Sequence, residues 1–238
     1  MPPATVRGVY SRAEKETVVL MMIKTFLLSG AALLLMACGT PYATVQNRAG
    51  DPVMLLGYDP VAYFTQGTPT RGSPEHKVLL PDRMYYFASA QSKALFTASP
   101  ARYEPQYGGF CASGAAFNIK LGSDPTSWQI LDGRLFIFGD VLGQTAWQVD
   151  PKWNVDHADR LWPAIQDKGW RGVSLGSYAA KVPHYKTGAQ IRREWEAKNP
   201  GKAWPTYDVG GMVANLFAKQ PGWRAAEGHS QPALGYPD

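Results

Sequence analysis

Cys111 is the residue of this chain whose type is best suited to chemistry, and it lies in the stretch "YGGFCASGAA" at 107–116. A thiolate is a ligand for soft metals such as Cu(I), whereas tetrahedral zinc takes four ligands, usually Cys and His. His76 and His157 are the histidines that could join Cys111, and Met54 or Met84 could add a thioether. No spacing motif connects these residues, so a copper or zinc site at Cys111 is one of three expectations.

The two other expectations for Cys111 need no metal. A cysteine between glycines and alanines suits a site where a helix starts against a sheet, with the thiol buried as a small hydrophobe. Alternatively, a position in the first turn of a helix would lower its pKa and make the thiol reactive. We take the buried side chain as the leading interpretation.

The N-terminal stretch "MMIKTFLLSGAALLLMACGT" has the pattern of an export signal. Lys24 precedes an apolar run from Phe26 to Ala37, which is too short to cross a bilayer, because a spanning helix needs about 20 residues. We predict a signal peptide over 1–37, with the true start at Met21 or Met22.

Residues 35–38, "LMAC", resemble the bacterial lipobox. This resemblance implies cleavage before Cys38, a palmitate-bearing lipid on its sulfur, and a membrane anchor followed by a tether over 38–50. The alternative is an ordinary cleaved signal beside a chance cysteine. Gly39 after the lipidated residue indicates the outer membrane of a bacterial envelope, with the protein facing the periplasm.

The segment "GYDPVAYF" at 57–64 gathers polar and aromatic groups in a short space. Asp59 and Tyr58 could line a ligand pocket that faces Cys111. The structural alternative, which we favour, is that Asp59 caps a short helix starting at Pro60 while Tyr63 and Phe64 fill the core.

The elements that must position these residues mix strands and helices without regular alternation. This order predicts an α+β fold with a small antiparallel sheet and short helices over 51–167. We expect a strand in "VMLL", two strands joined at Pro81–Arg83, and a hairpin at 128–138 that turns at Asp132-Gly133 and belongs to the core sheet. We expect three helices: one capped by Ser89, one starting near Gly109 and one capped near Asp156. The helix after Ser89 should bury an apolar stripe of Ala94, Leu95 and Ala98, with Phe96 beside it.

Residues 168–238 form a basic, aromatic, mostly helical or irregular extension, with 10 Lys and Arg against 5 Asp and Glu. Helices are predicted in "TGAQIRREWEAKNPG" at 187–201 and "DVGGMVANLFAKQPG" at 208–222. The charge could serve anionic headgroups or an acidic envelope partner, or it could be a solvated surface.

Four segments carry a resemblance that extends over most of 55–165. They are "LLGYDPVAYFTQGTPTRGS" at 55–73, "MYYFASAQSKALFTASPARYEPQYGGFCASGAA" at 84–116, "DPTSWQILDGRLFIF" at 124–138 and "DHADRLWPAI" at 156–165. Together they resemble the YHS domain family, in its GYDPVAYF-type branch. The resemblance implies a compact α+β fold. Related domains occur in metal-handling proteins, where cysteines are thought to bind copper or another soft metal. Val61 is followed here by Ala62, where the metal-handling branch has a cysteine, so Cys111 alone keeps sulfur.

No nucleophile elbow, metalloprotease motif, phosphate loop or dinucleotide fingerprint is present in the sequence. Nucleic-acid binding is not expected of an exported lipoprotein, despite a pI near 9.1. The sequence therefore predicts a membrane-anchored, non-catalytic lipoprotein, with metal binding as one expectation. The alternatives are a structural lipoprotein that binds an envelope partner through 168–238, and a thiol-dependent enzyme that uses Cys111.

Overall fold

The computed structural model describes residues 41–170, 172–174, 176 and 188–204, which all belong to one compact unit, Gly39–Asp238. Cys38, the predicted signal peptide and the predicted helix at 208–222 lie outside the described residues. In the part of the chain that is described, no helix is long and apolar enough to cross a membrane.

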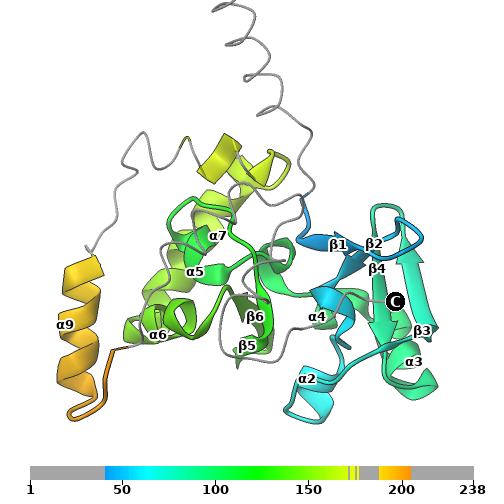
Figure 1. Cartoon of the computed structure of the whole chain (residues 1–238), viewed down its shortest axis with the longest axis horizontal. Coiled ribbons are helices and arrows are strands. Elements are labelled where there is room, and N and C mark those ends of the chain that lie inside the picture. The colour runs from blue at the N-terminus through cyan, green and yellow to red at the C-terminus, as the bar shows by residue number, and fades with distance from the viewer. Residues whose placement is uncertain (1–40, 171, 175, 177–187, 205–238) are drawn as a thin grey trace, which may run out of the picture. The chain divides into compact units, whose positions relative to one another are not determined.

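The larger sheet has four strands in the order β1-β2-β4-β3 (Figure 1). The strands are β1 Thr44–Gln46, β2 Pro52–Met54, β3 Ser73–Leu80 and β4 Arg83–Phe87. The neighbours β1/β2 and β3/β4 are antiparallel, but β2 and β4 run parallel. The predicted α+β class is confirmed, and the sheet is mixed where we expected it to be antiparallel.

The predicted tether over 38–50 is shorter than expected, because β1 lies within it. Ala43 and Val45 are buried, and the Ala43 amide donates to Gly108 O at 2.8 Å. The chain is therefore fixed to the core within a few residues of Cys38.

The hairpin predicted around Asp132-Gly133 is confirmed as β5 Asp124–Leu131 and β6 Arg134–Phe138. Asp132 (φ 50°) and Gly133 (φ 73°) both have the left-handed conformation that a tight two-residue turn requires. The two strands form a sheet of their own, so the expectation that they belong to the larger sheet was wrong. Leu135 and Ile137 nevertheless pack into the core of the larger sheet.

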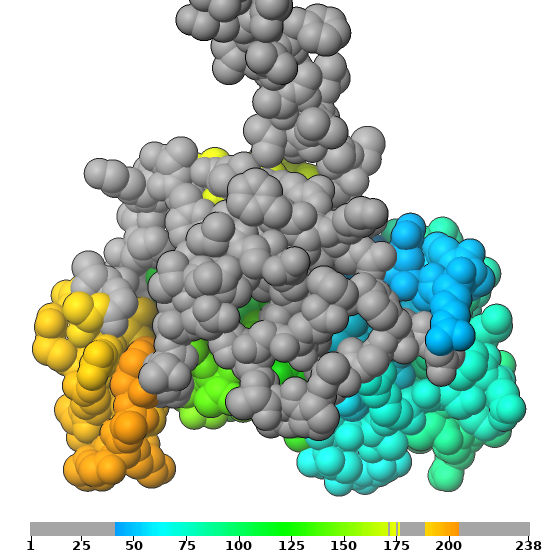
Figure 2. All heavy atoms as spheres, in the orientation of Figure 1, coloured from blue at the N-terminus to red at the C-terminus, as the bar shows by residue number. Residues whose placement is uncertain are grey.

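Short helices connect the strands and cover them. They are η1 Leu55–Gly57, α2 Ala62–Thr65, α3 Ala90–Ala98, α4 Pro100–Tyr103, η2 Gln106–Gly109, α5 Ala112–Ala116, α6 Val141–Val149, α7 Pro151–Ile165 and α9 Gly188–Lys198. The predicted helix at 187–201 is thus observed over 188–198. Helix α9 packs along α6, where Lys198 Nζ donates to Val149 O at 2.8 Å, and it forms the yellow-orange ridge in Figure 2.

Ser89 caps α3 as predicted, since its side chain accepts from the Ser92 amide at 3.1 Å. The predicted apolar stripe was wrong: Ala94, Leu95 and Ala98 are exposed, and Phe96 fills the core with Ser92 beside it. The large aromatic side chain decides which face of this weakly amphipathic helix is buried.

Helix α7 starts earlier than predicted. Its cap is Asp150, whose carboxylate accepts from the Trp153 amide, and Pro151 occupies the first turn. An aspartate followed by proline is a stronger start signal than Asp156, because proline has no amide hydrogen to leave unpaired there.

Two apolar clusters make up most of the core. The first lies between the larger sheet, α2, α3 and β6, and includes Met54, Tyr63, Phe87 and Phe96. The second lies between β6 and helices α5, α6 and α7, and includes Cys111, Phe138 and Trp147. Strand β6 contributes to both clusters and joins them.

Candidate functional site

Cys111 lies at the N-cap of α5 and is only 3% exposed. The turn that delivers it is left-handed over three consecutive residues, Tyr107 (φ 54°), Gly108 (φ 60°) and Gly109 (φ 77°). Its Sγ packs against Gly139 and Gly143, where an added Cβ would lie 3.6 and 3.5 Å from the sulfur. Small residues therefore surround the thiol on the side of the β6–α6 connection.

Burial raises the pKa of the Cys111 thiol to about 11. The backbone N–H groups of Gly114 and Gly139 act in the opposite direction, but they do not outweigh the loss of solvent. This favours the buried-hydrophobe interpretation over the reactive thiol, which needs a pKa below the ordinary value.

The metal-ligand candidates come from different parts of the fold. His76 lies on β3 and His157 on α7, Met54 is buried in the first cluster, and Cys111 is buried in the second. His157 stacks on Trp153, with ring centroids 3.7 Å apart, and contacts Arg160; burial and Arg160 lower its pKa. The described residues contain no group of three or more His, Cys, Asp or Glu side chains that could hold a metal ion.

Asp59 is fully buried, and its carboxylate is used within the fold. Oδ1 accepts from the Val61 amide at 2.8 Å and Oδ2 from the Ala88 amide at 3.0 Å. The first bond stabilises the turn before α2, and the second ties that turn to the end of β4. The helix itself starts at Ala62 with Val61 at its N-cap and no side-chain cap, so the prediction of a helix starting at Pro60 and capped by Asp59 was wrong. The structural interpretation of this aspartate is therefore favoured.

The tyrosines of the same motif are also oriented inwards. Tyr63 donates its hydroxyl to Pro125 O at 2.8 Å and packs edge-on against Trp128. Tyr58 is buried under the Arg71 guanidinium, which lies 4.5 Å from its ring centroid. Neither ring lies with Cys111, which belongs to the other cluster.

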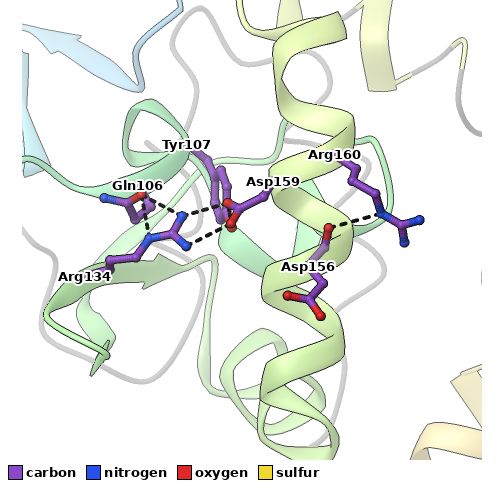
Figure 3. A network of polar contacts seen from close by, with 6 residues as sticks. All are labelled: Gln106, Tyr107, Arg134, Asp156, Asp159 and Arg160. Atoms are coloured by element: carbon purple, nitrogen blue, oxygen red, sulfur yellow. Dashed lines mark hydrogen bonds and ion pairs between the residues drawn. The ribbon is translucent and has the colours of Figure 1, made fainter.

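A polar network that sequence reasoning missed joins η2, β6 and α7 (Figure 3). Arg134 forms a two-pronged ion pair with Asp159, at 2.7 and 2.9 Å, and also donates to Gln106 Oε1. The Tyr107 hydroxyl donates to the same carboxylate at 2.9 Å. Hydrogen bonds from Arg134 lower the pKa of Asp159, so the network strengthens as this carboxyl ionises.

Lys120 is a second feature that the sequence did not single out. It is fully buried, and Nζ donates to Gln166 O at 2.6 Å and Lys168 O at 2.8 Å, just beyond the end of α7. Its ammonium lies 5.0 Å from the Phe110 ring and 5.2 Å from the Trp162 ring. A cation is favoured beside the carbonyl groups at a helix C-terminus. The two hydrogen bonds from Lys120 therefore fix the segment after α7 to the core.

Burial lowers the pKa of Lys120 to about 8, which makes the stability of the fold pH-dependent. Between pH 8 and 10.5 the unfolded chain binds more protons at this amine than the folded chain does, so stability should rise with pH. Relative to Lys120→Met, the free energy of unfolding of the wild type should increase by on the order of 2 kcal/mol across this window. Urea titrations of both proteins at pH 7, 8.5 and 10 measure the difference, and parallel pH profiles would contradict a buried, cationic Lys120.

Comparison of the chain with protein-family models, curated proteins and solved structures found no match. The fold defines an α+β module whose most chemically capable side chains are directed into the core. The resemblance to the YHS family stays an inference from sequence motifs.

Proposed function

We propose that this chain is an exported, lipid-anchored, non-catalytic binding module of the YHS type, held at the membrane by Cys38. The observation that carries the non-catalytic part is the internal use of the polar groups that the sequence offered for chemistry. Asp59 accepts hydrogen bonds from two backbone amides, Tyr63 donates one to a backbone carbonyl, and the Cys111 thiol is buried with its pKa raised. Such groups stabilise a scaffold, and they leave its surface to do the binding.

The buried Cys111 thiol is compatible with the oxidising compartment that the proposed export implies. A free thiol in an oxidising environment is vulnerable to disulfide exchange when it is exposed and ionised. Cys111 avoids both conditions, because it is 3% exposed and its pKa is raised from 9.0 to about 11. An exported protein can thus carry this single thiol without a disulfide partner.

Thiol labelling tests the non-catalytic assignment. In a Cys38→Ala variant, where Cys111 is the one remaining cysteine, iodoacetamide should label the native protein at pH 7.5 at least about 100-fold more slowly than the denatured protein. The factor follows from the two-unit difference in pKa alone, and exclusion of the reagent by packing adds to it.

An exposed thiol provides the matched control for reagent access. In the same background Ser99→Cys adds a cysteine at an exposed position, and one equivalent of label should enter that protein rapidly without denaturant. Rapid native labelling of Cys111 itself would instead favour the thiol-dependent enzyme.

A further inference from the structure

Only a few residues separate Cys38, the proposed attachment point of the lipid, from the folded core. Four residue steps separate Cys38 from Tyr42, so their Cα atoms lie at most about 14 Å apart, whatever conformation the intervening residues take. From there on the chain is fixed: Pro41 O lies against Gly108, the Ala43 amide donates to Gly108 O, and β1 pairs with β2.

This reach is short compared with the size of the module. The described residues alone, about 150 of them, form a body with a radius of gyration of about 15 Å, which is therefore roughly 40 Å across. A 14 Å connection cannot let such a body turn freely above a bilayer. One side of the module must face the lipid.

The side of the module that faces the lipid is the one that contains the residues around the start of β1. Ala43 packs with Phe110 and Trp170, and Trp162 packs against this cluster, so the end of α7 lies beside the entry of the chain into the sheet (Figure 1). Lys168 is exposed at this end of α7, and its carbonyl is held by the buried Lys120. We name the surface at this end of α7, with Trp162, Pro163 and Lys168, the anchor-side face.

We propose that the anchor-side face rests on the phospholipid headgroups of the membrane that holds the Cys38 lipid. This rests on the proposed function, because it requires the lipid at Cys38. Trp162 is a half-buried aromatic residue on this face, and the exposed Lys168 follows the exposed Asp167, so the orientation follows from the short reach to Cys38 and not from net charge. The exposed large apolar side chains among the described residues, Leu79, Leu95 and Val141, lie elsewhere, on β3, α3 and α6. The face should therefore contact headgroups without inserting into the acyl chains.

The test compares two exposed lysines in the full-length, lipidated protein on vesicles of phosphatidylethanolamine and phosphatidylglycerol. Lys168→Cys lies on the anchor-side face, and Lys202→Cys follows α9, which packs on α6. Each is labelled with a bimane fluorophore and exposed to lipids that carry a spin-label quencher on the headgroup or deep in the acyl chain. The unsubstituted protein measures any background from the buried Cys111.

We expect headgroup-label quenching at position 168 to exceed that at position 202 by at least threefold, with little quenching by the acyl-chain label at either site. Equal headgroup quenching at both sites, in protein that floats with the vesicles, would overturn the inference and leave the lipid anchor intact. Strong acyl-chain quenching at 168 would replace headgroup contact by insertion. Failure of the protein to float with the vesicles would overturn both the anchor and the inference.

Discussion

Gly108→Ala should lower the free energy of unfolding by about 2–5 kcal/mol. Gly108 has a φ of 60°, where an L side chain costs about 1–2 kcal/mol. In addition, an added Cβ would lie 2.0 Å from Pro41 O, so the backbone before β1 would have to move. Overpacking of this kind adds roughly 1–3 kcal/mol.

Gly67→Ala is the matched control for this change. Gly67 has a similar φ of 64°, but nothing lies within 4 Å of the position of an added Cβ. It should therefore show the cost of the conformation alone. Equal losses in urea denaturation of the two variants would mean that the contact between Pro41 and Gly108 does not hold the start of the chain to the core.

Asp59→Ala should be the most destabilising substitution in the GYDPVAYF segment, at about 3–6 kcal/mol. Two backbone amides, of Val61 and Ala88, lose a charged acceptor inside the protein, and each such bond contributes about 1.5–3 kcal/mol. Asp59→Asn should recover only part of this loss, because its carbonyl oxygen can accept from one of the two amides while its NH2 group faces the other donor.

The control for Asp59 is Asp156→Ala on α7. Asp156 is exposed, and its ion pair with Lys152 spans 3.3 Å between two solvent-accessible side chains. Such pairs contribute about 0.5 kcal/mol or less, so this variant should unfold close to the wild type. If Asp59→Ala were equally mild, Asp59 would not be a buried structural carboxylate, and the ligand-pocket interpretation of this segment would be favoured.

Features that depend on a few neighbouring residues, such as tight turns and helix caps, could be predicted from the sequence. Asp132-Gly133 specifies a left-handed turn, and Ser89 can cap only the helix that follows it, so both predictions were correct. The error at α7 was also local, since Asp150-Pro151 was the better start signal.

Other features depend on pairings between distant residues. The parallel contact of β2 with β4 joins Val53 to Met84, and no periodicity in the sequence reports it. Strand β1 was hidden in a short polar segment, because its stability comes from β2 and from Gly108 and little from its own composition.

The candidate site was predicted in part. The glycines and alanines around Cys111 indicated a close approach, and the structure shows a buried thiol there. Lys120 could not be singled out, because a lysine that becomes buried has the same sequence appearance as one that stays in solvent. Its burial follows from two carbonyls 46 and 48 residues further along the chain. The ion pair between Arg134 and Asp159 likewise joins residues that only the tertiary fold brings together.

Lipidation of Cys38 is the central claim about what this protein does. The most direct measurement is metabolic labelling with palmitate in a bacterial host that has the lipoprotein pathway, followed by purification and an intact mass. The account predicts label in the wild type, a mature chain that begins at Cys38 with a diacylglyceryl group on its sulfur, and no label in Cys38→Ala. A wild-type chain without label, or label that persists in Cys38→Ala, would contradict it.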